Sequence, residues 1–195
     1  MQIQRRTIEN DENYLRQISQ PVLQNDENYK NEIKILEQYC LETECFALAP
    51  IQIGIPKRMV YLKNTSLDVP LDDMNYNESK VLINPIVISQ KGHTKFWESC
   101  LSCLDNVGLV SRPYEMTVQY YDVDWNQHIE IFEGFKATVL SHELDHLDGI
   151  LHTDIAEEIL HMSSEEKKEF RISHPYEIIS KNCDYNTIIK KLKRK

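Results

Sequence analysis

The segment Thr138–His152, TVLSHELDHLDGILH, places His142, Glu143 and His146 in the order H-E-x-x-H. Residues four apart lie on the same face of an α-helix, so the two imidazoles can bind one metal ion. Glu143 lies about 100° further round the helix, near enough to reach a water molecule on the metal without being a ligand itself. The alternative is an amphipathic core helix whose histidines fall four apart by chance. The spacing favours a metal-binding helix.

The repeat of apolar residues predicts that this segment is helical. Two adjacent stripes follow the i, i+4, i+7, i+11 spacing of a helix face. Gly134 and the pair Asp148-Gly149 are the predicted boundaries. The stripes consist of Phe135, Val139, His142 and His146, and of Leu140, Leu144, Leu147 and Leu151.

The rest of the chain predicts strands before this helix and further helices at both ends. Alternating apolar residues favour strands, and helical periodicity with capping residues favours helices. Together they predict one α+β catalytic domain over residues 1–160, with an antiparallel or mixed sheet around the metal-binding helix. Residues 161–195 are predicted to form a helical extension with a basic end. The predicted strands are 57–63, 81–89 (interrupted at Asn84-Pro85), 94–97, 116–122 and 128–132; the predicted helices are 10–20, 26–41 and 163–173, and 64–79 is a predicted surface loop.

The composition is that of an ordinary globular domain, with 195 residues, 41% apolar and 27% charged. The net charge of −9 argues against nonspecific binding to DNA or to an anionic membrane. No apolar run is long enough to span a bilayer. The chain starts without an apolar leader, and its five cysteines suggest reduced thiols, which together predict a cytoplasmic protein. An organellar origin stays open.

The identity of a third metal ligand is open from the spacing alone. A catalytic zinc-type site uses three protein ligands and keeps one position for water. His142 and His146 supply two. His152 completes H-E-x-x-H-x-x-G-x-x-H, the pattern of metzincin proteases. Cys100 would instead give one thiolate and two imidazoles.

Three motifs resemble those of the peptide deformylase family, occur in the family's order, and extend the resemblance over roughly residues 10–160. The resemblance implies that Cys100 is the third ligand and that His152 is incidental. The motifs are ESCLS at Glu98–Ser102, similar to E-G-C-L-S; HELDH at His142–His146, similar to H-E-x-D-H; and ALAPIQ at Ala47–Gln52, similar to a glycine- and alanine-rich motif that ends in glutamine.

The first motif is atypical. The family pattern is G-x-G-x-A-A-x-Q, and this chain has Cys45, Ala47 and Pro50 at the two glycines and the second alanine. In the family, this segment lies beside the bound peptide and pairs with its backbone, so Ala47 is expected to contact substrate. A methyl group at Ala47 restricts close approach, and Pro50 lacks a backbone donor. These changes bear on substrate range or rate and leave the metal site intact.

The resemblance implies hydrolysis of the N-formyl group from polypeptides that begin with formyl-methionine, with release of formate. Glu143 would be the general base and then the general acid. The side-chain amide of Gln52 and the backbone N–H of Leu101 would stabilise the oxyanion. One thiolate and two imidazoles suit Fe²⁺, which is the expected ion, as well as Zn²⁺, Ni²⁺ or Co²⁺. We also expect Glu98 and Arg112 to form an ion pair that braces the Cys100 segment.

Two other functions remain open at this point. One is an H-E-x-x-H peptidase of the metzincin type with His152 as the third ligand. The other is a catalytically impaired, deformylase-like protein that binds nascent chains or ribosomes through Lys190–Lys195, where five of six residues are basic. A solvated helix end is the simpler interpretation of this basic segment.

Overall fold

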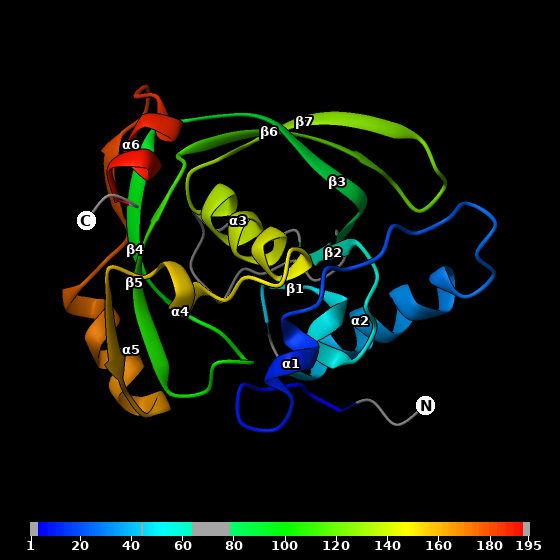
Figure 1. Ribbon diagram of the computed structural model, residues 1–195, viewed down its shortest axis with the longest axis horizontal. Coiled ribbons are helices and arrows are strands. Elements are labelled where there is room, and N and C mark those ends of the chain that lie inside the picture. Colours follow the sequence, from blue (N-terminus) through cyan, green and yellow to red (C-terminus); the bar gives the residue numbers. More distant parts are fainter. Residues whose placement is uncertain (1–3, 44, 64–78, 193–195) are drawn as a thin grey trace.

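The computed structural model describes residues 4–43, 45–63 and 79–192. Two antiparallel sheets enclose helix α3, as Figure 1 shows. Their strand orders are β1-β2-β3-β6-β7 and β8-β5-β4-β9. The predicted α+β architecture with sheets around a central helix is confirmed. The strands are β1 (Ala47–Leu48), β2 (Met59–Leu62), β3 (Lys80–Lys91), β4 (His93–Ser99), β5 (Asn106–Arg112), β6 (Glu115–Tyr121), β7 (Gln127–Glu133), β8 (Glu158–His161) and β9 (Glu177–Ser180).

Helix α3 (Phe135–Leu147) begins after Gly134 and ends at Asp148, as its sequence predicts. Its three leucines, Leu140, Leu144 and Leu147, pack into the main core, where Leu140 and Leu147 are fully buried. The H-E-x-x-H residues are therefore held on an element covered by protein on most sides. The other helices are α1 (Glu12–Leu15), α2 (Tyr29–Thr43), the 3₁₀ helix η1 (Pro50–Ile53), α4 (His152–Ile155), α5 (Ser164–Ser173) and α6 (Tyr185–Leu192).

The exit from α3 depends on glycine. Gly149 has φ +71°, and a Cβ there would lie 2.3 Å from the carbonyl oxygen of Arg16. Only glycine allows both the left-handed backbone and this close approach. The turn holds the segment after α1 against the end of α3, where the Ser19 amide donates to the Leu147 carbonyl at 2.8 Å.

Several parts of the prediction differ from the structure. The helix expected over 10–20 is only the four-residue α1, and the prediction omitted strand β5. The predicted interruption at Asn84-Pro85 is a register shift within the continuous strand β3, between Ile83 and Ile86. Asn84 has φ +51°, and its side chain bonds the backbone of Val22 at 2.9 Å through both amide atoms.

The segment after residue 160 adds a strand as well as helices. The predicted cap at Ser163 starts α5, with the Ser163 amide donating to the Glu166 carboxylate at 2.7 Å. Strand β9 then pairs with β4 and forms one edge of the four-stranded sheet. The predicted loop over 64–79 lies, apart from Ser79, outside the described residues, as do the side chains of Lys190–Lys195.

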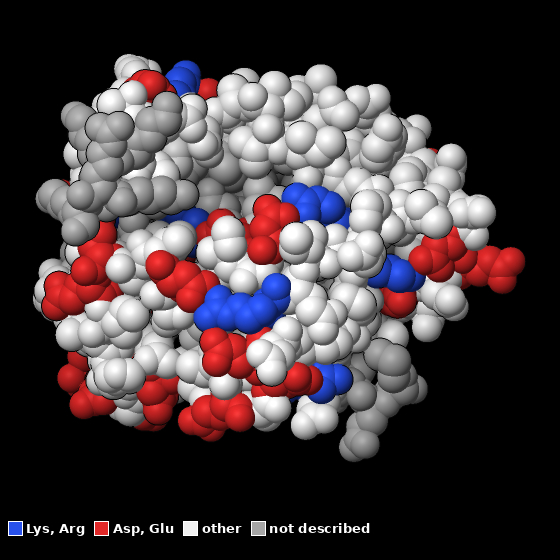
Figure 2. Space-filling model, viewed as in Figure 1, with Lys and Arg blue, Asp and Glu red and all other residues white. Residues whose placement is uncertain are grey.

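Acidic side chains are more widespread than basic ones on the face seen in Figure 2, in keeping with the net charge of −9. Within the described ranges, no helix combines the length and the apolarity that crossing a bilayer requires.

Candidate metal centre

Helix α3 and the end of β4 bring three metal-ligating side chains together. Ligand atoms of Cys100, His142 and His146 all lie within 4.8 Å of one another. The Cys100 Sγ is 3.2 Å from the His146 Nε2, and the two imidazole centroids are 5.0 Å apart. One sulfur and two imidazole nitrogens at this spacing suit a tetrahedral divalent cation with one position left open.

The orientation of His142 is set by a buried ion-pair network. Its Nδ1 lies 2.8 Å from a carboxylate oxygen of Glu98. An ionised carboxylate only accepts, so Nδ1 donates and Nε2 is left for a metal. The Arg112 guanidinium donates to both Glu98 oxygens, at 2.7 and 2.9 Å, and also to Asp145.

Electrostatics keep Glu98 ionised despite its burial. Burial raises the pKa of Glu98, but the charge and hydrogen bonds of Arg112 and the bond to His142 outweigh burial and hold this pKa well below its usual range. The carboxylate therefore remains an acceptor for His142 at any ordinary pH. Asp145 belongs to the same network, which explains its place between the two histidines of α3.

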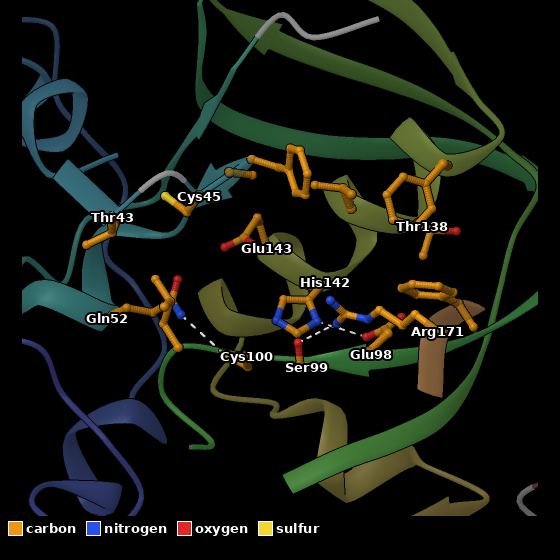
Figure 3. Close-up of a pocket in the computed structure, with 16 residues that line it drawn as sticks. Thr43, Cys45, Gln52, Glu98, Ser99, Cys100, Thr138, His142, Glu143 and Arg171 are labelled. Atoms are coloured by element: carbon orange, nitrogen blue, oxygen red, sulfur yellow. Dashed lines mark hydrogen bonds and ion pairs between the residues drawn. The ribbon is translucent and has the colours of Figure 1, made fainter. Parts of the chain in front are cut away.

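A cavity of about 300 Å³ opens onto this centre (Figure 3). Cys100, His142 and Glu143 form part of its wall, so two of the three candidate ligands can be reached from the cavity. The wall also includes Cys45 and Ala47 of the first motif. Thr138 and Val139, one helical turn before His142, also line it.

Glu143 is a buried carboxylate beside the ligands. Its Oε2 has no hydrogen-bond partner among the described residues. Burial raises the pKa of Glu143 to about 7. A carboxyl with a pKa near neutrality can both accept and donate a proton during a reaction.

Gln52 contacts Cys100 directly. Its Nε2 donates to the Cys100 Sγ at 3.3 Å and to the Ser102 hydroxyl at 3.2 Å, while its Oε1 accepts from the Ala49 amide at 3.1 Å. These contacts fix which end of the amide faces the centre. Pro50 occupies the start of η1, where a missing backbone donor is tolerated. Leu101 also lines the cavity.

His152 belongs to a different group of ligand atoms. It meets the 4.8 Å spacing together with Cys100 and Cys103, not with the pair His142 and His146. Its ring centroid is 5.6 Å from that of His142, and both of its ring nitrogens are buried without a partner among the described residues.

Arg171 of α5 is among the residues of the cavity wall that sequence reasoning missed. Its Nη2 donates to the Ser99 hydroxyl at 2.6 Å, across 72 positions of sequence. No local pattern signals such a contact. Only the start signal at Ser163–Glu166 and the stop at Ser173–Pro175 indicated a helix in this region.

Loss of Arg112 should be severe for stability. Arg112→Met leaves two carboxylates, Glu98 and Asp145, without their buried counter-charge, so we expect the free energy of unfolding to fall by about 3–5 kcal/mol. Urea unfolding of chelator-treated protein measures this. The control is Arg58→Met, which removes a more exposed pair with Asp148 and should cost about 1 kcal/mol or less. Equal losses in the two variants would contradict the assigned role of the network.

Known proteins share both the sequence and the fold. A family model described as polypeptide deformylase matches residues 5–162. A peptide deformylase of Pelagibacter ubique is 35% identical over 141 residues, covering 72% of this chain and 78% of the relative. One from Finegoldia magna is 33% identical over 168 residues, covering 85% of this chain and 95% of the relative.

Solved structures agree. The Met-Ala-Ser-bound class I type b peptide deformylase of Acinetobacter baumannii gives a TM-score of 0.68 at 25% identity, covering 79% of this chain and 98% of that one. The enzyme of Synechococcus elongatus in complex with actinonin gives 0.69 at 25% identity, covering 88% and 85%. These matches confirm the resemblance seen in the three motifs. The chain therefore belongs to the polypeptide deformylase family and is an enzyme of the metallohydrolase class.

Proposed function

We propose that this enzyme removes the N-formyl group from polypeptides that begin with formyl-methionine, in the cytoplasm, and releases formate. The observation that carries the proposal is the group Cys100, His142 and His146. Cys100 and His142 of this group line a cavity together with the buried carboxylate of Glu143. The Met-Ala-Ser peptide in the Acinetobacter baumannii relative supports a peptide substrate.

Cys100, His142 and His146 would hold one divalent cation. When bound, the cation supplies Lewis-acid chemistry and lowers the pKa of water to about 7. The donor set suits Fe²⁺, our proposed ion, and also Zn²⁺, Ni²⁺ or Co²⁺. Because Glu98 fixes the tautomer of His142, the site is oriented before a metal arrives.

The side chains of the cavity account for the proton transfers. Glu143 accepts a proton from the attacking water as the new C–O bond forms at the formyl carbon. It then gives the proton to the amide nitrogen as the C–N bond breaks, which yields formate and a free amine. Gln52 Nε2 and the Leu101 backbone N–H would donate to the developing oxyanion, and their place on the cavity wall supports this.

The position of β1 supports peptide binding alongside the first motif. Ala47–Leu48 is the terminal strand of the five-stranded sheet, and Ala47 lies on the cavity wall. An extended peptide can add to such an edge by backbone hydrogen bonds. Thr138 and Val139 would then contact the methionine side chain.

Formate release from formyl-Met-Ala-Ser tests the proposal. Protein prepared anaerobically with Fe²⁺ should turn over the peptide, and chelator-stripped protein should not, because no cation would activate water. Adding back Fe²⁺, Zn²⁺, Ni²⁺ or Co²⁺ separately identifies the ions that support turnover. Protein that holds one metal per chain and releases no formate would overturn the proposal, leaving a different acyl substrate or a binding function.

A further inference from the structure

Arg171 is a cation in the cavity wall without an anionic partner. It extends from α5 and donates through Nη2 to the Ser99 hydroxyl, and its guanidinium carbon lies 5.7 Å from the centre of the Phe96 ring (Figure 3). Its Nε is buried without an acceptor, and no carboxylate in the described ranges forms an ion pair with it. The guanidinium is thus only partly satisfied.

Comparison with Arg112 shows that Arg171 lacks a carboxylate partner among the described residues. Arg112 is fully buried, whereas Arg171 is half-buried, and the carboxylates of Glu98 and Asp145 compensate the charge of Arg112. Arg171 has one neutral hydroxyl and one ring face instead, and burial lowers its pKa. A planar guanidinium with free N–H groups binds a carboxylate through paired, charge-assisted hydrogen bonds. A substrate carboxylate would supply the counter-charge that the protein does not.

The position of Arg171 links this charge to the reaction. It lines the same cavity as His142 and Glu143, and it comes from the segment beyond residue 162, where the match to the family model ends. Its partner Ser99 is itself a departure from the glycine of the E-G-C-L-S motif. A residue beyond the matched region and a departure from the motif therefore meet in one hydrogen bond at the cavity.

We propose that Arg171 and Ser99 form a carboxylate-binding subsite that selects formyl peptides with a carboxylate close to the formyl-methionine. This inference rests on the proposed deformylase function. The carboxylate has two possible sources, an acidic second residue or the C-terminus of a short formyl peptide. Both present the same planar anion to the guanidinium.

Two matched substrate pairs separate these sources. Formyl-Met-Asp-amide against formyl-Met-Asn-amide tests the side chain, and formyl-Met-Ala against its amide tests the terminus. In at least one pair, kcat/KM should favour the carboxylate by about 10- to 100-fold, the range for hydrogen bonds to charged groups. Arg171→Gln should abolish this preference, and Arg171→Lys, which keeps the charge without the planar fork, should retain part of it.

The control is Lys168→Gln, which removes the same charge from an exposed position of α5 away from the cavity wall and should keep the full preference. Equal rates within both pairs, or an equal loss for all four peptides in Arg171→Gln, would overturn the subsite while leaving the deformylase intact. If metal-loaded protein cleaves none of the peptides, the proposed function fails. In that case, calorimetry on the Glu143→Gln protein compares the binding affinities of the Asp and Asn peptides. Tighter binding of the Asp peptide supports the subsite, and equal affinities overturn it.

Discussion

Replacing Glu143 with glutamine should lower kcat for formate release by about 10²–10⁴-fold, the range for loss of a general acid–base group. Glutamine keeps the shape of the side chain but cannot accept the proton of the attacking water. Because Glu143 is not among the three grouped ligands, the variant should retain its metal. Rate measurements on protein of known metal content test this. A variant that loses its metal, or that keeps its rate, would contradict the assigned role.

The same substitution should stabilise the metal-free protein at alkaline pH. Burial raises the pKa of Glu143 to about 7, so its ionised form is disfavoured in the folded chain. The free energy of unfolding therefore falls as pH rises from about 4.3, the pKa of an exposed glutamate, towards 7. Well above pH 7, Glu143→Gln should be more stable than the unchanged protein by about 3–4 kcal/mol.

Urea unfolding at pH 5 and pH 8 measures this difference. Glu158→Gln changes an exposed glutamate and should alter neither value. A stability gain of Glu143→Gln that is equal at both pH values would argue against a buried, titrating carboxylate.

The central helix could be predicted because its signal is local. Its two stripes repeat at helical spacing, and Gly134 and Asp148 bound it in both sequence and structure. The three candidate metal ligands could be nominated only with the help of the three motifs, because spacing alone left Cys100 and His152 equal. Spatial proximity separates them, since His142 and His146 group with Cys100 and not with His152.

Strand β5 was missed for a physical reason. Gly108 in its middle weakens the strand pattern, but a Cβ there would lie 2.8 Å from the Ala156 Cβ and 3.0 Å from the His152 ring. Gly108 therefore weakens the sequence signal of β5 and also allows α4 to pack against this strand. Likewise, the helix expected over 10–20 ends early because the amides of Ser19 and Gln20 donate to the carbonyls of Leu147 and Pro56, both at 2.8 Å.

Contacts across the fold were the least accessible from sequence. Glu98 and Arg112 are 14 positions apart on paired strands, close enough for an ion pair to be suggested. Arg171 and Ser99 are 72 apart, and the tertiary fold alone brings α5 to the cavity. The sequence alone therefore could not place the Arg171 cation in the cavity wall.

Loss of a side chain that only hydrogen-bonds to a metal ligand lowers metal affinity by about 10–100-fold. Cys100→Ala should lower it further, because this substitution removes a proposed direct ligand. Turnover at limiting metal should fall with it. Cys103→Ala is a matched control, since it removes a buried thiol three positions away that the proposed centre does not use. The third variant is His152→Ala, which removes the residue that the metzincin pattern would require.

Metal content after dialysis against a weak chelator separates the three ligand sets. If Cys100, His142 and His146 hold the metal, only Cys100→Ala is depleted. Depletion in His152→Ala with retention in Cys100→Ala would favour the peptidase pattern instead. Depletion in Cys100→Ala, Cys103→Ala and His152→Ala alike would place the metal in the second group of ligand atoms. In that case His142 would be free of metal, and the Glu98 carboxylate that now fixes its tautomer would orient an imidazole available for proton transfer.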